Sequence, residues 1–276
     1  MSTIQASHAQ PSPIASRSRP SGLGVAVNLT KREMVRIVRQ PSRLIASIAT
    51  PVLIWVLLGS GFANSFKPPT ELLESAGASY GLYLLPGMLT MTVLFSSIFG
   101  AISLIEDRHE GFLQSVLVSP APRWALGLSK LLGAALLATA QAAVLLPAAY
   151  VLGDPISILG LGQILVVLFC ASLGVAGIGL AAAWWVDSVQ GFHGIMNLVL
   201  LPMWLLSGSV FPLAGASGWM KIVMMANPVT WCSQTLQSVL GLEYQNLQIA
   251  WTITLGFGLF GILLSWMTLG KGVKRS

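Results

Sequence analysis

Residues 158–185 read ILGLGQILVVLFCASLGVAGIGLAAAWW and contain no charged side chain. The hydrocarbon core of a bilayer takes about 20 consecutive apolar residues as helix, at about 1.5 Å of rise per residue. Five further stretches are similarly long, apolar and free of charge near their middles. We therefore expect six transmembrane helices, at Leu44–Phe62, Leu82–Ile105, Ala125–Leu152, Ile158–Trp185, Gly194–Val210 and Leu247–Leu269.

The composition of the 276-residue chain favours an all-α, polytopic membrane protein. Hydrophobic residues make up 54% of it and charged residues only 9%, whereas soluble domains carry about 25% charged residues. The apolar runs are continuous, while the strands of a membrane barrel alternate between apolar and polar residues. Small residues let membrane helices approach closely. Gly177-x-x-x-Ala181 has such a spacing, but in a span rich in Gly and Ala we interpret it as a chance occurrence.

The distribution of the 15 Lys and Arg residues predicts the orientation. Seven precede the first span, three lie in or near the loop between the second and third spans, and three follow the last span in the tail 271–276. Only Lys67 and Lys221, in the segments 63–80 and 213–246, fall on the other side. Because basic residues near span ends stay inside, we expect cytoplasmic termini in a cell (plasma or inner) membrane. The net charge of +6 is then a topology signal rather than a sign of nucleic-acid binding.

The chain before the first span divides into two parts. Residues 1–24 are rich in Ser, Pro, Ala and Gln and lack an apolar run, which predicts a disordered tail and no cleavable signal peptide. Residues 25–43 place apolar and basic residues on opposite faces at about 100° per residue. We expect an interfacial amphipathic helix whose arginines point toward anionic lipid headgroups, with a solvated charge run as the alternative. Those arginines are Arg32, Arg36, Arg39 and Arg43.

The loop between the second and third spans combines charge with a short apolar helix. The charged stretch 106–110 leads into the apolar segment 112–118, and Pro120 and Pro122 end it. One face of this helix, which is too short to span a membrane, carries Phe112, Leu113, Val116 and Leu117. Such a face either binds a partner or packs against the span ends of this chain, and the residues alone favour neither.

Two sequence blocks, one in this loop and one around the fifth span, share their order and spacing with a known family. The first is Glu106-Asp-Arg-x-x-Gly111, followed by Leu117-Val-Ser-Pro120. The second runs from Asn197 through Pro202 and Leu206-Ser-Gly-x-x-Phe-Pro212 to Asn227-Pro-Val-Thr-Trp231. Together they resemble the membrane (permease) subunits of type-2 ATP-binding-cassette (ABC-2 type) exporters, over about residues 25–270. Phe112 and Gln237 depart from the usual small polar residue and Arg of that family.

The resemblance implies a permease that works with a separate ATPase and with a second permease subunit, identical or a close paralogue. It implies that the ATPase binds ATP and Mg, that this chain holds no cofactor or catalytic residue, and that re-entrant short helices occupy residues 213–246. Related exporters move drugs, lipid-linked glycans and glycolipids. The ATPase-coupling residues that it implies are Glu106, Asp107, Arg108, Gly111, Phe112, Val116, Leu117 and Pro120.

The residues themselves agree with an energy source outside this chain. There is no G-x-x-x-x-G-K-[ST] motif for ATP, no carboxylate in a span suited to proton or sodium coupling, and no metal-ligand spacing of His, Cys and carboxylates. Ser207 has no neighbouring base in the sequence. The alternative from another class is an intramembrane enzyme that acts on a lipid or glycan, with Asp187, His193 and Asn197 near the inner boundary.

The substrate path is expected between two chains. One bundle of charge-free spans leaves little room for a pore, so we predict a dimer whose seam is lined by the second and fifth spans. Met and aromatic side chains adapt to varied apolar surfaces, which favours an amphiphilic substrate. The alternative is that these residues only pack inside one bundle. The predicted lining is Met88, Met91, Phe95, Met203, Trp204 and Ser207.

Overall fold

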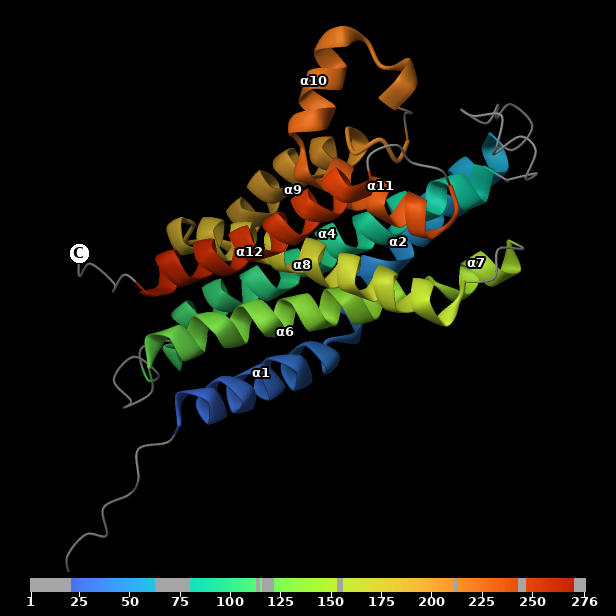
Figure 1. The fold of residues 1–276 in the computed structure, drawn as a ribbon. Helices are drawn as coiled ribbons and strands as arrows, with labels where there is room; N and C mark the ends of the chain where they lie inside the picture. Colours follow the sequence, from blue (N-terminus) through green and yellow to red (C-terminus); the bar gives the residue numbers. More distant parts are fainter. Residues whose placement is uncertain are drawn as a thin grey trace, which may run out of the picture.

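The computed structural model describes residues 21–62, 80–112, 115, 122–152, 156–210, 213–242 and 247–270. The regular structure within these ranges is helical, as the sequence predicts (Figure 1). The predicted tails at 1–24 and 271–276, apart from residues 21–24, lie outside the described residues. The helices are α1 (Gly22–Val38), α2 (Pro41–Gly61), α4 (Tyr80–His109), α6 (Arg123–Ala143), α7 (Pro147–Val151), α8 (Ile158–Trp185), α9 (Val189–Leu205), η1 (Leu213–Gly215), α10 (Gly218–Ala226), α11 (Pro228–Val239) and α12 (Leu247–Gly270).

Five helices in the described part are long and apolar enough to cross a membrane. They correspond to the first, second, third, fourth and sixth predicted spans, and the fourth has the predicted bounds, Ile158–Trp185. The third is interrupted between α6 and α7, where Pro147 stands at the start of α7. The predicted fifth span, Gly194–Val210, corresponds to α9, which begins at Val189 because Ser188 caps it, and which has 17 residues. The count of six spans therefore stays a prediction.

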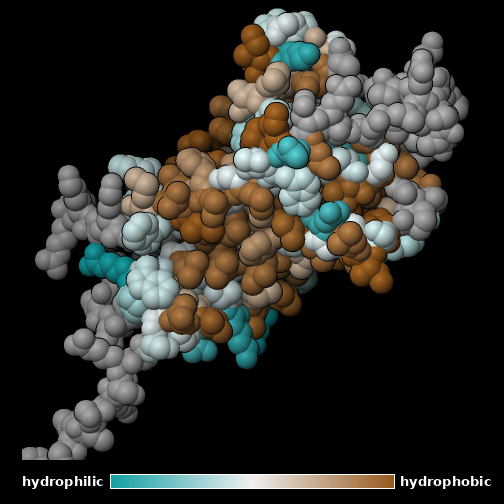
Figure 2. Space-filling view, viewed as in Figure 1, coloured by the Kyte–Doolittle hydropathy of each residue, from teal (hydrophilic) through white to brown (hydrophobic). Residues whose placement is uncertain are grey.

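The second predicted span is the centre of the bundle. Of the residues in the most apolar 18-residue stretch of α4, 89% are buried, whereas the corresponding share is 11% for α2 and 28% for α12. Helices α2, α6, α8 and α9 all contact α4, and Figure 1 shows these long helices running side by side. Apolar side chains cover most of the visible middle of the molecule (Figure 2). The centre of the bundle is thus held by α4, while α2 and α12 present apolar surface outward, as in a membrane protein.

Glycines bring α8 and α12 into backbone contact. A Cβ placed on Gly261 of α12 would lie 2.1 Å from the carbonyl oxygen of Leu173, and one on Gly177 would lie 2.4 Å from the carbonyl oxygen of Gly261. Real Cβ atoms never come this near to backbone, so only glycine fits at either position. The interpretation of the Gly177 spacing as chance is therefore wrong, because Gly177 does mark a close approach of two helices.

Within residues 213–242, the short helices α10 and α11 follow α9, as the family resemblance implies. Helix α11 packs against α4, α8 and α12, and its N-cap Asn227 also donates from its side-chain nitrogen to the Met203 carbonyl over 2.6 Å. Helix α10 projects from the bundle (Figure 1) and exposes Trp219 and Ile222. Whether these helices re-enter a membrane stays a prediction.

Candidate functional site at the junction of α1, α4 and α6

One stripe of α1 is buried against α6. The stripe is Ala26, Thr30, Glu33 and Ile37, at the spacing of one helix face. Figure 1 shows α1 lying alongside α6, and a Cβ on Gly133 of α6 would lie 3.0 Å from Cβ of Glu33. Gly133 thus allows a carboxylate from α1 to come close to α6.

Lys130 of α6 is the buried centre of this junction. Its side chain is 1% exposed, and the side chains of Glu33 and Asp107 are 4% and 0% exposed. The Lys130 Nζ donates to Glu33 Oε1 over 2.8 Å, to Ser103 Oγ over 2.9 Å, and to Asp107 Oδ2. Ser103 also donates to Glu33 Oε2 over 3.0 Å. The ammonium group therefore joins α1, α4 and α6 at one point.

Two arginines of α1, and Arg43 in the first turn of α2, extend the cluster over the end of α4. Arg36 binds Asp107 at 2.6 Å and Glu106 at 3.0 Å, and Arg43 also binds Glu106. Arg32 lies 3.0 Å from Glu33. Burial by itself lowers the pKa of Arg36, but the carboxylates around it, chiefly Asp107 and Glu106, raise the pKa above its ordinary value. Its charge therefore persists at any physiological pH.

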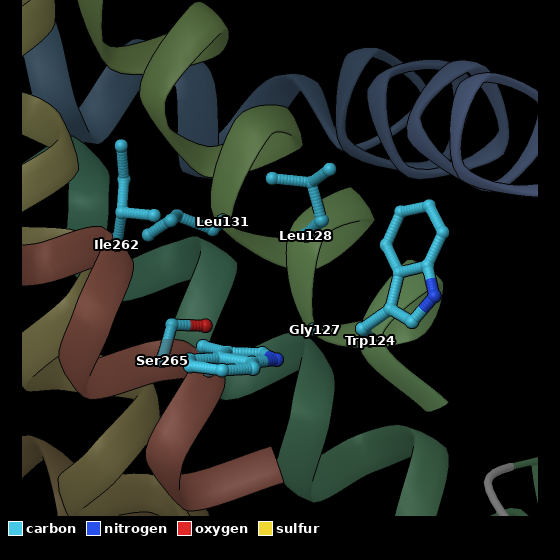
Figure 3. A pocket seen from close by; sticks show the side chains of 7 residues that line it. Trp124, Gly127, Leu128, Leu131, Ile262 and Ser265 are labelled. Carbon is cyan, nitrogen blue, oxygen red and sulfur yellow. The ribbon is translucent and has the colours of Figure 1, made fainter. Parts of the chain in front are cut away.

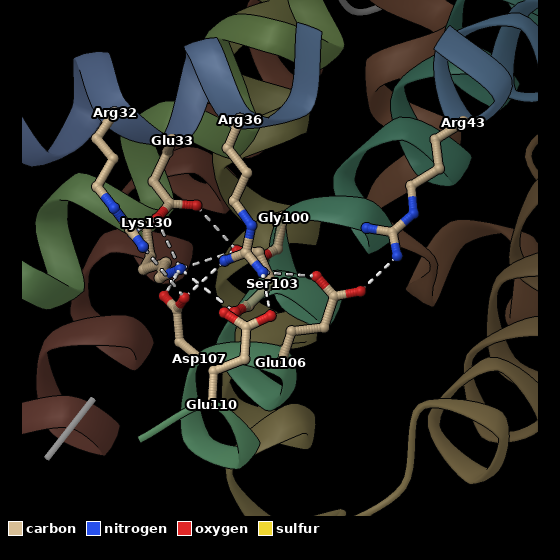
Figure 4. Close-up of polar contacts among 10 residues, drawn as sticks. All are labelled: Arg32, Glu33, Arg36, Arg43, Gly100, Ser103, Glu106, Asp107, Glu110 and Lys130. Carbon is tan, nitrogen blue, oxygen red and sulfur yellow. Dashed lines mark hydrogen bonds and ion pairs between the residues drawn. The ribbon is translucent and has the colours of Figure 1, made fainter. Parts of the chain in front are cut away.

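These contacts correct the expectation that the arginines of α1 face lipid headgroups. Arg36 and Arg43 point toward α4, because Glu106 and Asp107 offer a pairing partner that a one-helix pattern does not reveal (Figure 4). Arg39 alone of the four is exposed. The prediction that the spans hold no charge is also wrong at Lys130, which lies inside the predicted third span and is buried there.

The ionic cluster, defined as Arg32, Glu33, Arg36, Arg43, Glu106, Asp107, Glu110 and Lys130, is balanced in charge. Four cations face four carboxylates, and each member has at least one opposite charge within 4.0 Å. Buried charges are tolerated when they are paired and hydrogen-bonded, and removing one partner leaves a costly unpaired charge. The cluster therefore joins four helices, α1, α2, α4 and α6, and removal of a buried member leaves its partners without their opposite charge.

Arg108 makes a second connection, from the end of α4 to the end of α8. Its guanidinium donates to the carbonyl oxygens of Ala183 and Trp184 over 3.0 and 3.1 Å, and to Asp187 Oδ1 over 2.9 Å. The last carbonyls of a helix lack intrahelical partners and carry partial negative charge, so a cation here stabilises the helix end. One side chain thus fixes where α8 ends relative to α4.

We expect Arg108→Ala to destabilise the protein by about 1.5–3 kcal/mol, because charged hydrogen bonds to partly buried carbonyls are lost. Asp187→Asn is the matched control and should have a much smaller effect, because the Asp187 side chain is 90% exposed and exposed ion pairs contribute little. Thermal unfolding of both variants in detergent measures the difference. Equal losses in the two variants would mean that the ion pair, and not the carbonyl contacts, holds α8.

The segment that leaves α4 starts with a tight turn against α1. Gly111 has φ +74°, a left-handed conformation that favours glycine. The guanidinium of Arg32 lies 3.6 Å from the centroid of the Phe112 ring, so part of Phe112 contacts this chain itself. Val116, Leu117 and Pro120 lie outside the described residues, so contact of this segment with an ATPase stays a prediction.

The structure places the predicted path residues mostly inside the subunit. Met88, Met91, Trp204 and Ser207 are at most 3% exposed, and the Trp204 indole donates to the Gly87 carbonyl oxygen over 2.8 Å. Helices α4 and α9 do pack together, as expected, but within one chain. For these four residues the structure agrees with the alternative, which is that they pack inside one bundle. Phe95 and Met203 are half-buried.

The residues considered for an enzyme site are not joined by any hydrogen bond within the described residues. Asp187 binds Arg108, and His193 lies edge-on to the Phe99 ring. Within the same residues, no three His, Cys, Asp or Glu side chains are grouped so as to hold a metal ion. No observation in this region favours catalysis.

Comparison with known proteins places most of this chain in one family. Residues 26–240 match the family described as ABC-2 type transporter. The chain belongs to the ABC-2 type transporter family. This match covers α1, the ionic cluster and all helices up to α11, so the cluster lies within the part that defines the family membership.

Relatives of this ABC-2 permease carry names of transport proteins. The transport permease ycf38 of Porphyra purpurea is 24% identical over 246 residues, which are 88% of this chain and 80% of that protein. The ycf38 protein of Cyanophora paradoxa is 24% identical over 213 residues, or 76% of this chain and 71% of that one. YbhR of Escherichia coli K12, named for multidrug ABC transport, is 26% identical over 175 residues, which are 62% of this chain and 47% of YbhR.

Sequence reasoning missed three members of this site. Glu106, Asp107 and Arg108 were singled out, but Lys130, which pairs with Asp107, was not, and neither were Glu33 and Ser103, which also bind Lys130. Two signals were available in the sequence. Glu33 is an isolated acid in a basic helix, and Lys130 is a lysine about two turns inside an apolar run. Ionisable residues within membrane segments usually pair with one another, so these two residues are natural partners.

Proposed function

We propose that this chain is the membrane-spanning permease subunit of an ATP-driven exporter. It moves an amphiphilic substrate, such as a drug, a lipid, or a glycolipid or glycan, with a separate ATPase subunit that binds ATP and Mg. The observation that carries the proposal is the ionic cluster, which fixes α1 and α6 to the end of α4 from which the segment 111–122 leaves. This is the end at which the family resemblance places the ATPase contact.

The cluster and Arg108 supply a physical route for movement. A displacement of the segment 111–122 acts first on the end of α4, because Gly111 is the second residue after His109, which ends that helix. Lys130 and Arg36 pass the displacement to α6 and α1, and Arg108 passes it to α8. Since α4 is the most buried long helix, its displacement changes the packing of the whole bundle. Coupling needs such contiguous contacts between elements.

We propose that two permease subunits, identical or closely related, form the membrane part. Exposed apolar residues on α2 and α9, such as Leu53, Leu57 and Leu198, face lipid or a second chain. The partly exposed Phe95 and Met203 are the members of the predicted lining that stay candidates for the substrate path. Apolar surfaces without fixed charges suit an amphiphile better than an ion, whose hydration they cannot replace.

The ATPase contact is tested by placing one charge at two neighbouring positions. We expect Val116→Asp to abolish co-purification of the ATPase, because a charge in a buried contact costs several kcal/mol. Ser115→Asp is the matched control, since Ser115 is exposed and outside the apolar cluster. Membrane insertion should be normal in both. Undiminished co-purification with Val116→Asp would show that this segment packs on its own subunit.

The proposed orientation follows from the thirteen basic residues on one side and two on the other. We expect a C-terminal alkaline phosphatase fusion to be inactive and a C-terminal fluorescent-protein fusion to be bright. A phosphatase fusion after residue 66 should be active, as a control for export of the reporter. An active C-terminal phosphatase fusion would reverse the orientation.

A further inference from the structure

A small apolar cavity opens between the beginning of α6 and the end of α12. It has a volume of about 180 Å³, and its walls include Trp124, Leu128 and Leu131 of α6 and Ile262 and Trp266 of α12. Trp124 is 37% exposed and Trp266 is 62% exposed, so the cavity reaches the surface of the bundle. A cavity of roughly 150 Å³ with apolar walls accepts a hydrocarbon molecule the size of benzene.

One polar group in this cavity has no partner. Ser265 is 2% exposed, and its hydroxyl makes no hydrogen bond within the described residues. Figure 3 shows the Ser265 hydroxyl among the side chains that line the cavity. A buried hydroxyl without a partner is unfavourable by about 1–3 kcal/mol, which indicates that an acceptor occupies this space when the protein is in its membrane.

A basic residue stands at the start of α6, next in the chain to Trp124, which lines the cavity. Arg123 begins α6, is exposed, and forms no ion pair among the residues described. The first turn of α6 contains no acidic residue, so the helix end and Arg123 both attract an anion. Lys271 follows α12 directly in the sequence. Tryptophans such as Trp124 and Trp266 favour the depth of lipid headgroups.

We propose that this cavity binds one anionic phospholipid of the bilayer. The phosphate lies at Arg123, an ester carbonyl accepts the hydrogen bond of Ser265, and an acyl chain continues past Leu131 and Ile262. The spacing fits this order, since Arg123 and Leu131 are separated by about 12 Å along α6 at about 1.5 Å per residue. The site lies between α6 and α12, and none of the predicted path residues lines it.

The test uses the purified full-length chain in phosphatidylcholine nanodiscs with a phosphatidylglycerol analogue that carries a photoreactive diazirine on its acyl chain. We expect labelled peptides from α6 around Leu131 and from α12 around Ile262. Unlabelled phosphatidylglycerol should compete about fivefold better than phosphatidylcholine, since one basic residue near the surface contributes about that factor. Labelling spread over all lipid-facing helices, or equal competition by the two lipids, would overturn the proposal.

Five substitutions, one of them a control, separate lipid binding from folding and from contact with a second chain. Arg123→Gln should abolish the preference for phosphatidylglycerol, whereas Lys221→Gln, an exposed charge on α10, should keep it. Ser265→Ala should reduce labelling about two- to tenfold, the effect of one hydrogen bond, while thermal stability without the lipid is unchanged or higher. Leu128→Trp should fill the cavity and block labelling. Full labelling of Ser265→Ala and Leu128→Trp would overturn the proposal. Ile262→Cys tests the other occupant: a disulfide between two chains at this position would show that a second copy fills the cavity, and would also overturn the proposal.

Discussion

Lys130→Met should destabilise the protein by about 3–5 kcal/mol, the range for removal of one partner from a buried ion pair. The variant leaves the carboxylates of Glu33 and Asp107 without their shared cation, although Arg36 still contacts Asp107. We expect a lower yield of monodisperse protein and a much lower midpoint of thermal unfolding in detergent. Coupling to the ATPase should be lost as well, because α1 and α6 are no longer held to the end of α4.

Two further variants show whether the cause is an unpaired charge. Lys221→Met removes an exposed lysine on α10 and should leave stability unchanged. The double variant Glu33→Gln/Lys130→Met removes one carboxylate together with the cation and should be more stable than Lys130→Met alone. The double variant is compared with the two single variants Glu33→Gln and Lys130→Met. If its loss of stability equals the sum of their two losses, the pairing contributes nothing and only side-chain packing has been lost.

The long helices could be predicted from the sequence because membrane spans depend on local composition. Stretches such as 158–185 show their character without any knowledge of their neighbours, and the bounds of α8 and α12 match closely. The exception is α9. The run of apolar residues predicts a start at Gly194, but the helix begins at Val189, because the Ser188 side chain caps it. Helix ends depend on such single side chains, so they are harder to locate than helix centres.

The ionic cluster could not be predicted, because its members are distant in the chain. Glu33 and Lys130 are 97 residues apart, and Arg36 and Asp107 are 71 apart. Taken alone, a basic helix is equally suited to lipid headgroups and to carboxylates of the same protein. Only the packing of α1 on α6, which follows from Gly133 and the buried stripe of α1, distinguishes the two. The path residues have the same ambiguity, since Met and Trp are as suitable for a core as for a substrate.

Gly261→Leu should separate α8 from α12 and give the largest loss of folded protein among single substitutions outside the ionic cluster. The new Cβ would lie 2.1 Å from the Leu173 carbonyl oxygen and 2.7 Å from Cα of Gly174. Backbone atoms cannot move aside as a flexible side chain can, so the helices must move apart. An overpacked core site costs about 1–3 kcal/mol when side chains adjust, and we expect a larger loss here, measured as the fraction of protein that stays monodisperse after heating in detergent.

The control lies on the same helix and isolates the effect of the contact. A Cβ on Gly256 has no atom within 4 Å, and Gly256 is exposed. Gly256→Leu adds the same side chain to α12, with the same change in helix propensity and hydrophobicity, and should leave the protein intact. Since membrane helices associate through close van der Waals contact rather than through exclusion of water, the backbone approach at Gly261 contributes directly to the attraction between α8 and α12. Equal tolerance of leucine at 256 and 261 would mean that the two helices stand further apart than this structure shows.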